Sequence, residues 1–124
     1  MRRADRNCFE AWVREALDAV PCELATRVKN LEVVVEEWPS KEELRSVGLP
    51  ANATLFGLYQ GIPLPKRGTE TAGLPDRIVL YRGPISERCT SAEEIREEVR
   101  RTVLHELGHY FGFDEATLEA LGWD

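Results

Sequence analysis

Residues 91–112 read SAEEIREEVRRTVLHELGHYFG, and this stretch decides the fold. Ser91 followed by Glu94 has the spacing of a capping box, which predicts that a helix begins here. Gly112 suits the left-handed position at which helices commonly end. Apolar side chains recur at three- and four-residue steps along one arc of this helix: Ile95, Val99, Val103, Leu104, Leu107, Tyr110 and Phe111. We therefore expect one long amphipathic helix near the end of the chain, with its apolar side packed on a sheet.

The same helix contains His105-Glu106-Leu107-Gly108-His109, an HExxH pattern. Residues four apart lie on one helix face, so both imidazoles can reach a single ion. The chain has two histidines, both in this motif and both outside the apolar arc, which argues against core histidines. The pattern predicts zinc ligands at His105 and His109, with Glu106 as a catalytic carboxylate beside the metal. Two unrelated surface histidines are the alternative interpretation.

Acidic residues just beyond the helix are candidates for a third ligand. The run from His109 to Glu115 resembles HExxHxxGxx(H/D), the extended motif of metzincin-type zincins. There the third residue after the glycine binds the metal, and counting from Gly112 that position is Glu115. Asp114, one residue earlier, is the alternative ligand. Either acid could instead cap or begin a final short helix that ends at Leu121.

The rest of the chain supplies helices and a small sheet. Strands are expected where β-branched or alternating apolar runs occur, at residues 31–36, 54–60 and 77–81. Helices are expected at 9–20, before Pro21, in a short turn at 23–28, and at 40–47, where Ser40 and Glu43 form another capping box. Residues 62–75 are rich in proline and glycine and predict a long loop, while Gly83-Pro84 should stop the third strand. The fold class is therefore α+β, with a mixed or antiparallel sheet of three to four strands.

Length and composition limit the possible functions. The chain has 124 residues, which fits a single domain over 1–124. The net charge of -6 argues against nucleic-acid binding, and no apolar run is long enough for a membrane span. The chain has three cysteines, Cys8, Cys22 and Cys89, which is an odd number, and no two of them form a CxxC motif. We therefore expect reduced thiols and a cytoplasmic location. We also expect a monomer.

A family resemblance extends over nearly the whole chain, from about Phe9 to Leu121. Residues 55–61, 74–78 and 103–112 are similar, in order and spacing, to the small bacterial zincin-like metallopeptidases. This resemblance implies a minimal α+β zincin fold, a zinc ion on His105 and His109, and Glu106 as the catalytic carboxylate. The chain differs from the metzincins in having no methionine for a Met-turn, since its only methionine is Met1.

The expected function is zinc-dependent hydrolysis of peptide bonds, with Glu106 as general base toward a zinc-activated water. By fold analogy, a peptide substrate would align along the exposed edge of the strand at 54–60. The alternative is a non-catalytic zinc-binding protein that uses the same helix for stability or for docking a partner. A cysteine or a further carboxylate such as Glu119 in the fourth zinc position would favour this alternative.

Overall fold

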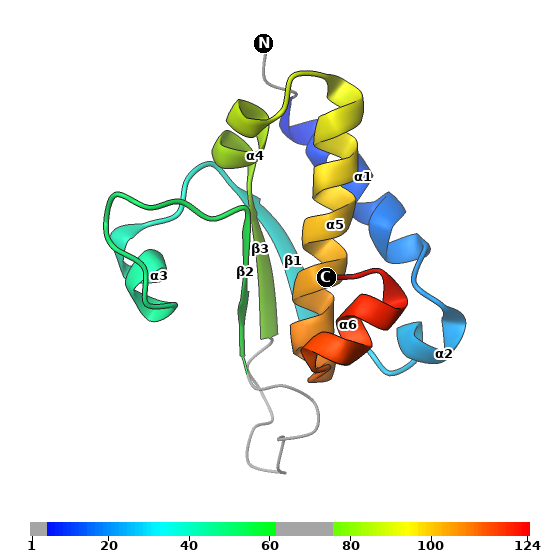
Figure 1. The fold of residues 1–124 in the computed structure, drawn as a ribbon. Coiled ribbons are helices and arrows are strands. Elements are labelled where there is room, and N and C mark those ends of the chain that lie inside the picture. Colours follow the sequence, from blue (N-terminus) through cyan, green and yellow to red (C-terminus); the bar gives the residue numbers. More distant parts are fainter. Residues whose placement is uncertain (1–4, 62–75) are drawn as a thin grey trace.

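The computed structural model describes residues 5–61 and 76–124, and its longest element is the predicted C-terminal helix (Figure 1). This helix, α5, spans Ala92–Phe111, and Gly112 ends it in the left-handed conformation with φ 76°. Ser91 caps its start by accepting a hydrogen bond from the Glu94 N–H at 3.1 Å. The Glu94 carboxylate accepts from the Thr90 N–H instead of the Ser91 N–H, so the predicted capping box is only half formed.

Among the described residues, three strands form one mixed sheet, in agreement with the predicted mixed or antiparallel sheet of three to four strands. They are β1 (Leu31–Glu36), β2 (Gly57–Gln60) and β3 (Asp76–Tyr81), in the order β1-β3-β2. β1 runs parallel to β3, and β2 runs antiparallel to β3. β2 begins three residues later than expected, at Gly57, although Phe56 still accepts a hydrogen bond from Tyr81. Because β2 is last in the order β1-β3-β2, it is an edge strand in the described part of the chain.

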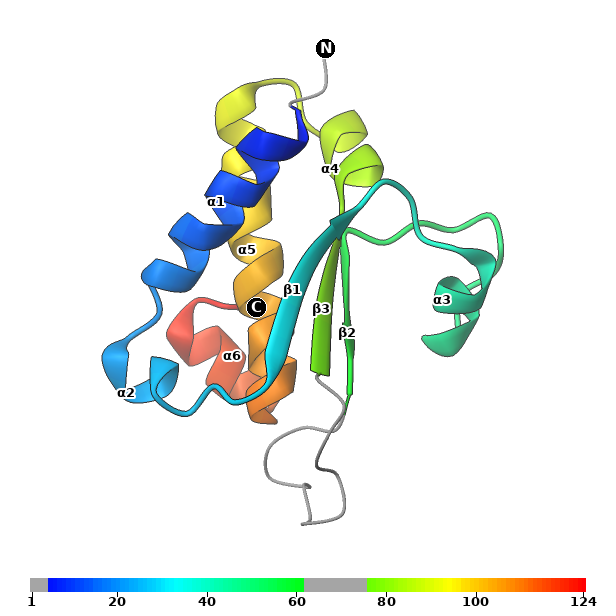
Figure 2. The same cartoon turned by 180° about the vertical axis from the view of Figure 1, so that it is seen from behind.

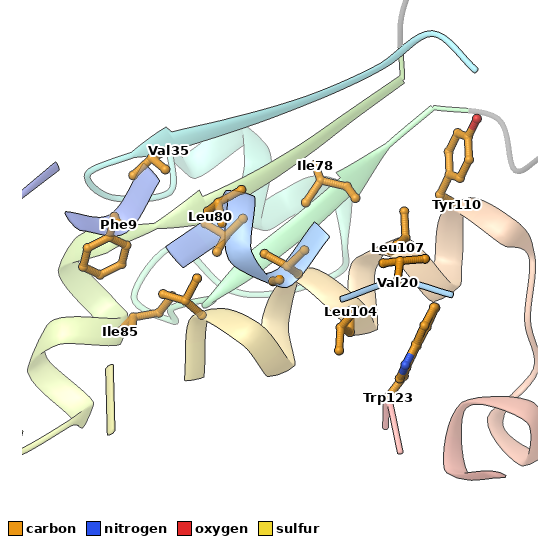
Figure 3. Close-up of a cluster of buried hydrophobic side chains, with 14 of the residues drawn as sticks. Phe9, Val20, Val35, Ile78, Leu80, Ile85, Leu104, Leu107, Tyr110 and Trp123 are labelled. Carbon is orange, nitrogen blue, oxygen red and sulfur yellow. The ribbon is translucent and has the colours of Figure 1, made fainter. Parts of the chain in front are cut away.

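The main core lies between the sheet and two helices that cover one of its faces. Figures 1 and 2 show α5 beside α1 (Arg6–Asp18) on this face. All seven residues of the predicted apolar arc of α5 are buried, which confirms its orientation. Ile78 and Leu80 of β3 join them in one cluster, together with Phe9 of α1 (Figure 3). Val79 and Tyr81 alternate to the opposite face and pack with Leu58 of β2.

The shorter helices follow the predicted order with one addition. α2 spans Cys22–Ala25, α3 spans Lys41–Ser46 on the side of the sheet away from α5, and α6 spans Glu115–Leu121. The Ser40 capping box at the start of α3 is complete. The addition is α4 (Arg82–Arg88), which begins where Gly83-Pro84 predicted only a stop. Pro84 fits there because the first turn of a helix does not need its missing N–H.

Two further predictions concern the loop at 62–75 and the absence of a membrane span. The predicted loop at 62–75 lies outside the described residues. Within the described ranges, no helix is long and apolar enough to cross a membrane.

Candidate metal centre

The two histidines of α5 face each other at the spacing of metal ligands. Their Nε2 atoms are 3.2 Å apart, and both side chains are partly buried. Zinc binds imidazole nitrogen at about 2.0–2.1 Å, and two such bonds at the tetrahedral angle separate the nitrogens by about 3.3–3.4 Å. One ligand atom each from His105, Glu106 and His109 lie within 4.8 Å of one another. The pair therefore fits a zinc ion without rearrangement of the helix.

The chain end fixes the orientation of His105. Its Nδ1 lies 3.1 Å from the Trp123 carbonyl oxygen, which accepts a hydrogen bond from the ring N–H. A neutral imidazole that donates from Nδ1 keeps its lone pair on Nε2, the atom that faces His109. Trp123 is buried in the main core, and Figure 1 shows the segment from α6 to the chain end folded back beside α5. This contact sets both the tautomer and the ring direction that metal binding needs.

Glu106 lies between α5 and the edge strand β2. Burial raises the pKa of its carboxyl group, while the charge of His105 and a hydrogen bond from the Tyr59 backbone N–H act in the opposite direction. Gly57 makes this close packing possible. A Cβ at residue 57 would lie 2.5 Å from Thr102 Cγ2 and 3.5 Å from Glu106 Cγ. A raised pKa in a partly enclosed site is typical of carboxylates that transfer protons.

His109 is electrostatically suited to remain neutral. Burial lowers the pKa of its imidazole, and the neighbouring His105 lowers it further, whereas Glu115 acts to raise it. A neutral imidazole is the form that binds zinc, so the shift favours metal binding over protonation at neutral pH.

The two candidate third ligands occupy different positions. Asp114 is the N-cap of α6, and its carboxylate accepts a hydrogen bond from the Thr117 N–H at 2.8 Å. Glu115 is the exposed first residue of α6, near enough for its charge to act on His109. In the described parts of the chain, the compact ligand group consists of His105, Glu106 and His109 and includes neither acid.

Two pockets meet at Glu106 and Gly57. One, of about 490 Å³, extends past His105 between β2 and the middle of α5. The other, of about 380 Å³, extends past His109 and Tyr59. Both volumes lie in the usual range for ligand sites. The candidate metal centre therefore lies between two pockets that both follow β2.

Sequence reasoning identified the residues of the HExxH motif but missed two that support them. Trp123 acts through its backbone carbonyl, for which no side-chain pattern exists. Gly57 matters because it has no side chain, and a glycine at the start of a strand only suggests a close backbone approach.

Comparisons with known proteins agree with this geometry. A family model described as zincin-like metallopeptidase matches residues 28–123. A solved structure of a conserved hypothetical protein from T. thermophilus is similar, with a TM-score of 0.56 and 26% sequence identity. The similarity covers 95% of this chain and 97% of the other. No curated protein matches. Because the family match covers most of the chain and includes the helix with both histidines, this protein belongs to the zincin-like metallopeptidase family.

Proposed function

We propose that the protein hydrolyses peptide bonds with a zinc ion held by His105 and His109. The observation that carries this proposal is the pair of Nε2 atoms 3.2 Å apart, with the Glu106 carboxylate in the same group. When bound, zinc would supply Lewis acidity that polarises the scissile carbonyl and lowers the pKa of water. This is the chemistry expected of two imidazoles and an adjacent carboxylate on one helix.

Glu106 would act as the general base. A carboxylate oxygen of Glu106 would accept a proton from the attacking water and later donate it to the leaving amine. Its pKa, raised by burial, makes the carboxylate a stronger base than an exposed glutamate. The Tyr59 N–H that hydrogen-bonds to this carboxylate would hold it in place while the proton moves.

The substrate would lie along the edge of β2. The Phe56–Tyr81 hydrogen bond and the register of β2 with β3 direct the backbone groups of Gly57 and Tyr59 away from β3. The Tyr59 N–H is directed to Glu106, and the N–H and carbonyl of Gly57 face the side on which a peptide strand would pair. A peptide paired there would run through both pockets and past the histidine pair.

Glu115 is the proposed third ligand. Its side chain is exposed at the start of α6, and its charge already acts on His109. Asp114 is less suited, because its carboxylate accepts the hydrogen bond that caps α6.

The composition of the ligand group favours an enzyme over the non-catalytic alternative. A structural zinc site is closed by a fourth protein ligand, whereas a catalytic site keeps that position open. Within residues 5–61 and 76–124, no cysteine belongs to the group of His105, Glu106 and His109, so no thiolate closes the site there.

The test compares zinc-loaded native protein with the Glu106→Gln variant on a broad peptide library, with cleavage read by mass spectrometry. Glu106→Gln should keep zinc but lower the hydrolysis rate by about 10²- to 10⁴-fold, because it removes only the base. Glu93→Gln is the matched control, since Glu93 is an exposed glutamate of the same helix outside the ligand group and outside both pockets. Equal cleavage by native protein and Glu106→Gln would exclude Glu106 as the base. Absence of cleavage by zinc-loaded native protein would favour the non-catalytic alternative.

A further inference from the structure

The pocket beside His105 contains two arginines that the proposed hydrolysis does not use. Arg88 is the last residue of α4, and Arg101 lies in the middle of α5, so two separate elements bring their side chains to one pocket. We propose that this pocket binds a carboxylate group of the substrate through Arg88 and Arg101. The proposal rests on the proposed function, because it names the class of peptide that the same cleft selects.

Neither arginine forms a salt bridge with a described residue, although the charge of Arg101 acts on Glu97. In the part of the chain that the structure describes, Arg88 and Arg101 lie within ion-pair distance of no carboxylate. Other arginines are paired, as with Arg96 and Glu15 at 2.7 Å or Arg100 and Glu97 at 2.5 Å. What distinguishes Arg88 and Arg101 is that both are exposed and line the same pocket. They remain available to an anionic ligand.

Carboxylates also line this pocket, but they do not neutralise the arginines by contact. Glu98 accepts a hydrogen bond from the Thr102 hydroxyl at 3.2 Å, Glu106 belongs to the metal centre, and Asp124 completes the set. Guanidinium groups bind carboxylates through two parallel hydrogen bonds, which a flat carboxylate of the substrate can accept.

The opposite pocket has a different character. Val47, Leu55 and Leu58 line it beside His109 and Tyr59, so it suits an apolar side chain. The cleft is therefore asymmetric: mostly apolar residues line the pocket on the His109 side, and two arginines lie among three acidic residues in the pocket on the His105 side. It fits peptides with an apolar residue on one side of the scissile bond and a carboxylate on the other. That carboxylate could come from an Asp or Glu side chain or from a free C-terminus.

The experiment uses fluorescent, N-acetylated alanine peptides with one leucine. One pair has either a free C-terminal carboxylate or a C-terminal amide. In a second set, all amidated, each peptide has a single Asp or Asn at one of the four positions after leucine. Binding is measured by fluorescence anisotropy with zinc-loaded Glu106→Gln protein, and cleavage is measured with zinc-loaded native protein. The variants Arg88→Gln, Arg101→Gln and their double variant are each combined with Glu106→Gln, and Arg100→Gln is the control because Arg100 pairs with Glu97 outside the pocket.

We expect the carboxylate peptides to bind about five- to tenfold more tightly than their amide partners, since both arginines are solvent-exposed. The preference should decrease with added salt, disappear in the double variant and persist in Arg100→Gln. The first peptide pair and the Asp/Asn set separate a C-terminal carboxylate from a side-chain one. Equal binding of carboxylate and amide peptides, or a preference unchanged in the double variant, would overturn the proposal. If the preference follows the arginines but native protein cleaves no peptide, the carboxylate site stands and the proposed hydrolysis fails.

Discussion

Trp123 contributes to the candidate metal centre through a main-chain atom. Its carbonyl accepts the His105 Nδ1 hydrogen bond, and its buried indole ring anchors that carbonyl in the main core. The orientation of a candidate metal ligand thus depends on a residue 18 positions away in sequence. The HExxH pattern of the helix can be recognised in the sequence, whereas the contact between His105 and the Trp123 carbonyl cannot.

Glu106 should make the metal-free protein less stable at neutral pH. Folding raises the pKa of the Glu106 carboxyl group, because burial disfavours its charged form. The stability that the protonated group contributes is fully present below the unfolded pKa and is lost as pH rises through the folded pKa. Glu106→Gln carries no charge to desolvate, and it should therefore unfold at a higher urea concentration than native protein at pH 7. This advantage should decrease as pH falls toward about 4.3, the ordinary pKa of glutamate. Urea titrations of both metal-free proteins between pH 5 and 8 provide the measurement, and a native protein more stable than Glu106→Gln at pH 8 would contradict it.

At the scale of elements, the contact between α5 and α6 depends on Gly108. A Cβ at residue 108 would lie 2.2 Å from Cδ2 of the fully buried Leu118. Replacing glycine by alanine inside a helix ordinarily stabilises it by about 0.5–1 kcal/mol. Here overpacking should dominate, since it typically costs about 1–3 kcal/mol. The close approach of α6 is also what brings the chain end to His105.

We therefore expect Gly108→Ala to lower the free energy of unfolding by about 1–2 kcal/mol. Urea denaturation of the metal-free protein measures this loss. In the double variant with Leu118→Ala, the new methyl group enters the space that leucine vacates. The double variant should therefore lose less free energy of unfolding than the sum of the losses of the two single variants. A Gly108→Ala protein more stable than the native one would show that α6 does not pack as described.

The start of α6 allows stability and metal binding to be separated with neighbouring residues. Asp114→Ala removes the helix cap and should cost about 0.5–2 kcal/mol while zinc affinity is kept. Glu115→Gln should leave stability nearly unchanged but weaken zinc binding by about tenfold or more if Glu115 is a ligand. Urea denaturation and competition with a zinc-sensitive dye measure the two effects. The opposite pattern would transfer the third-ligand assignment to Asp114.

For the whole molecule, local patterns predicted the fold better than they predicted the cleft. The 3.6-residue period of α5, the capping residues and the β-branched strands are encoded locally, and they were found with the correct order and a mixed sheet. The helix at Arg82–Arg88 was missed because Gly83-Pro84 resembles a stop, although proline is tolerated in a first turn.

The cleft could not be predicted in the same way, because it consists of contacts between distant segments. Arg88 and Arg101 reach one pocket from α4 and α5, and Gly57 approaches Glu106 from β2. No spacing in the sequence encodes these approaches. The HExxH motif was the exception, because one helical turn places all its functional atoms together.

The proposed chemistry depends on a zinc centre at His105 and His109, and the zinc content of the purified protein tests for this centre most directly. Protein stripped of metal, reloaded with zinc and dialysed should contain about one zinc ion per chain by mass spectrometric metal analysis. His105→Ala and His109→Ala should each reduce this content to near zero, while Glu98→Gln, on the same helix outside the ligand group, should keep it. Stoichiometric zinc in both histidine variants, or none in the native protein, would contradict the account.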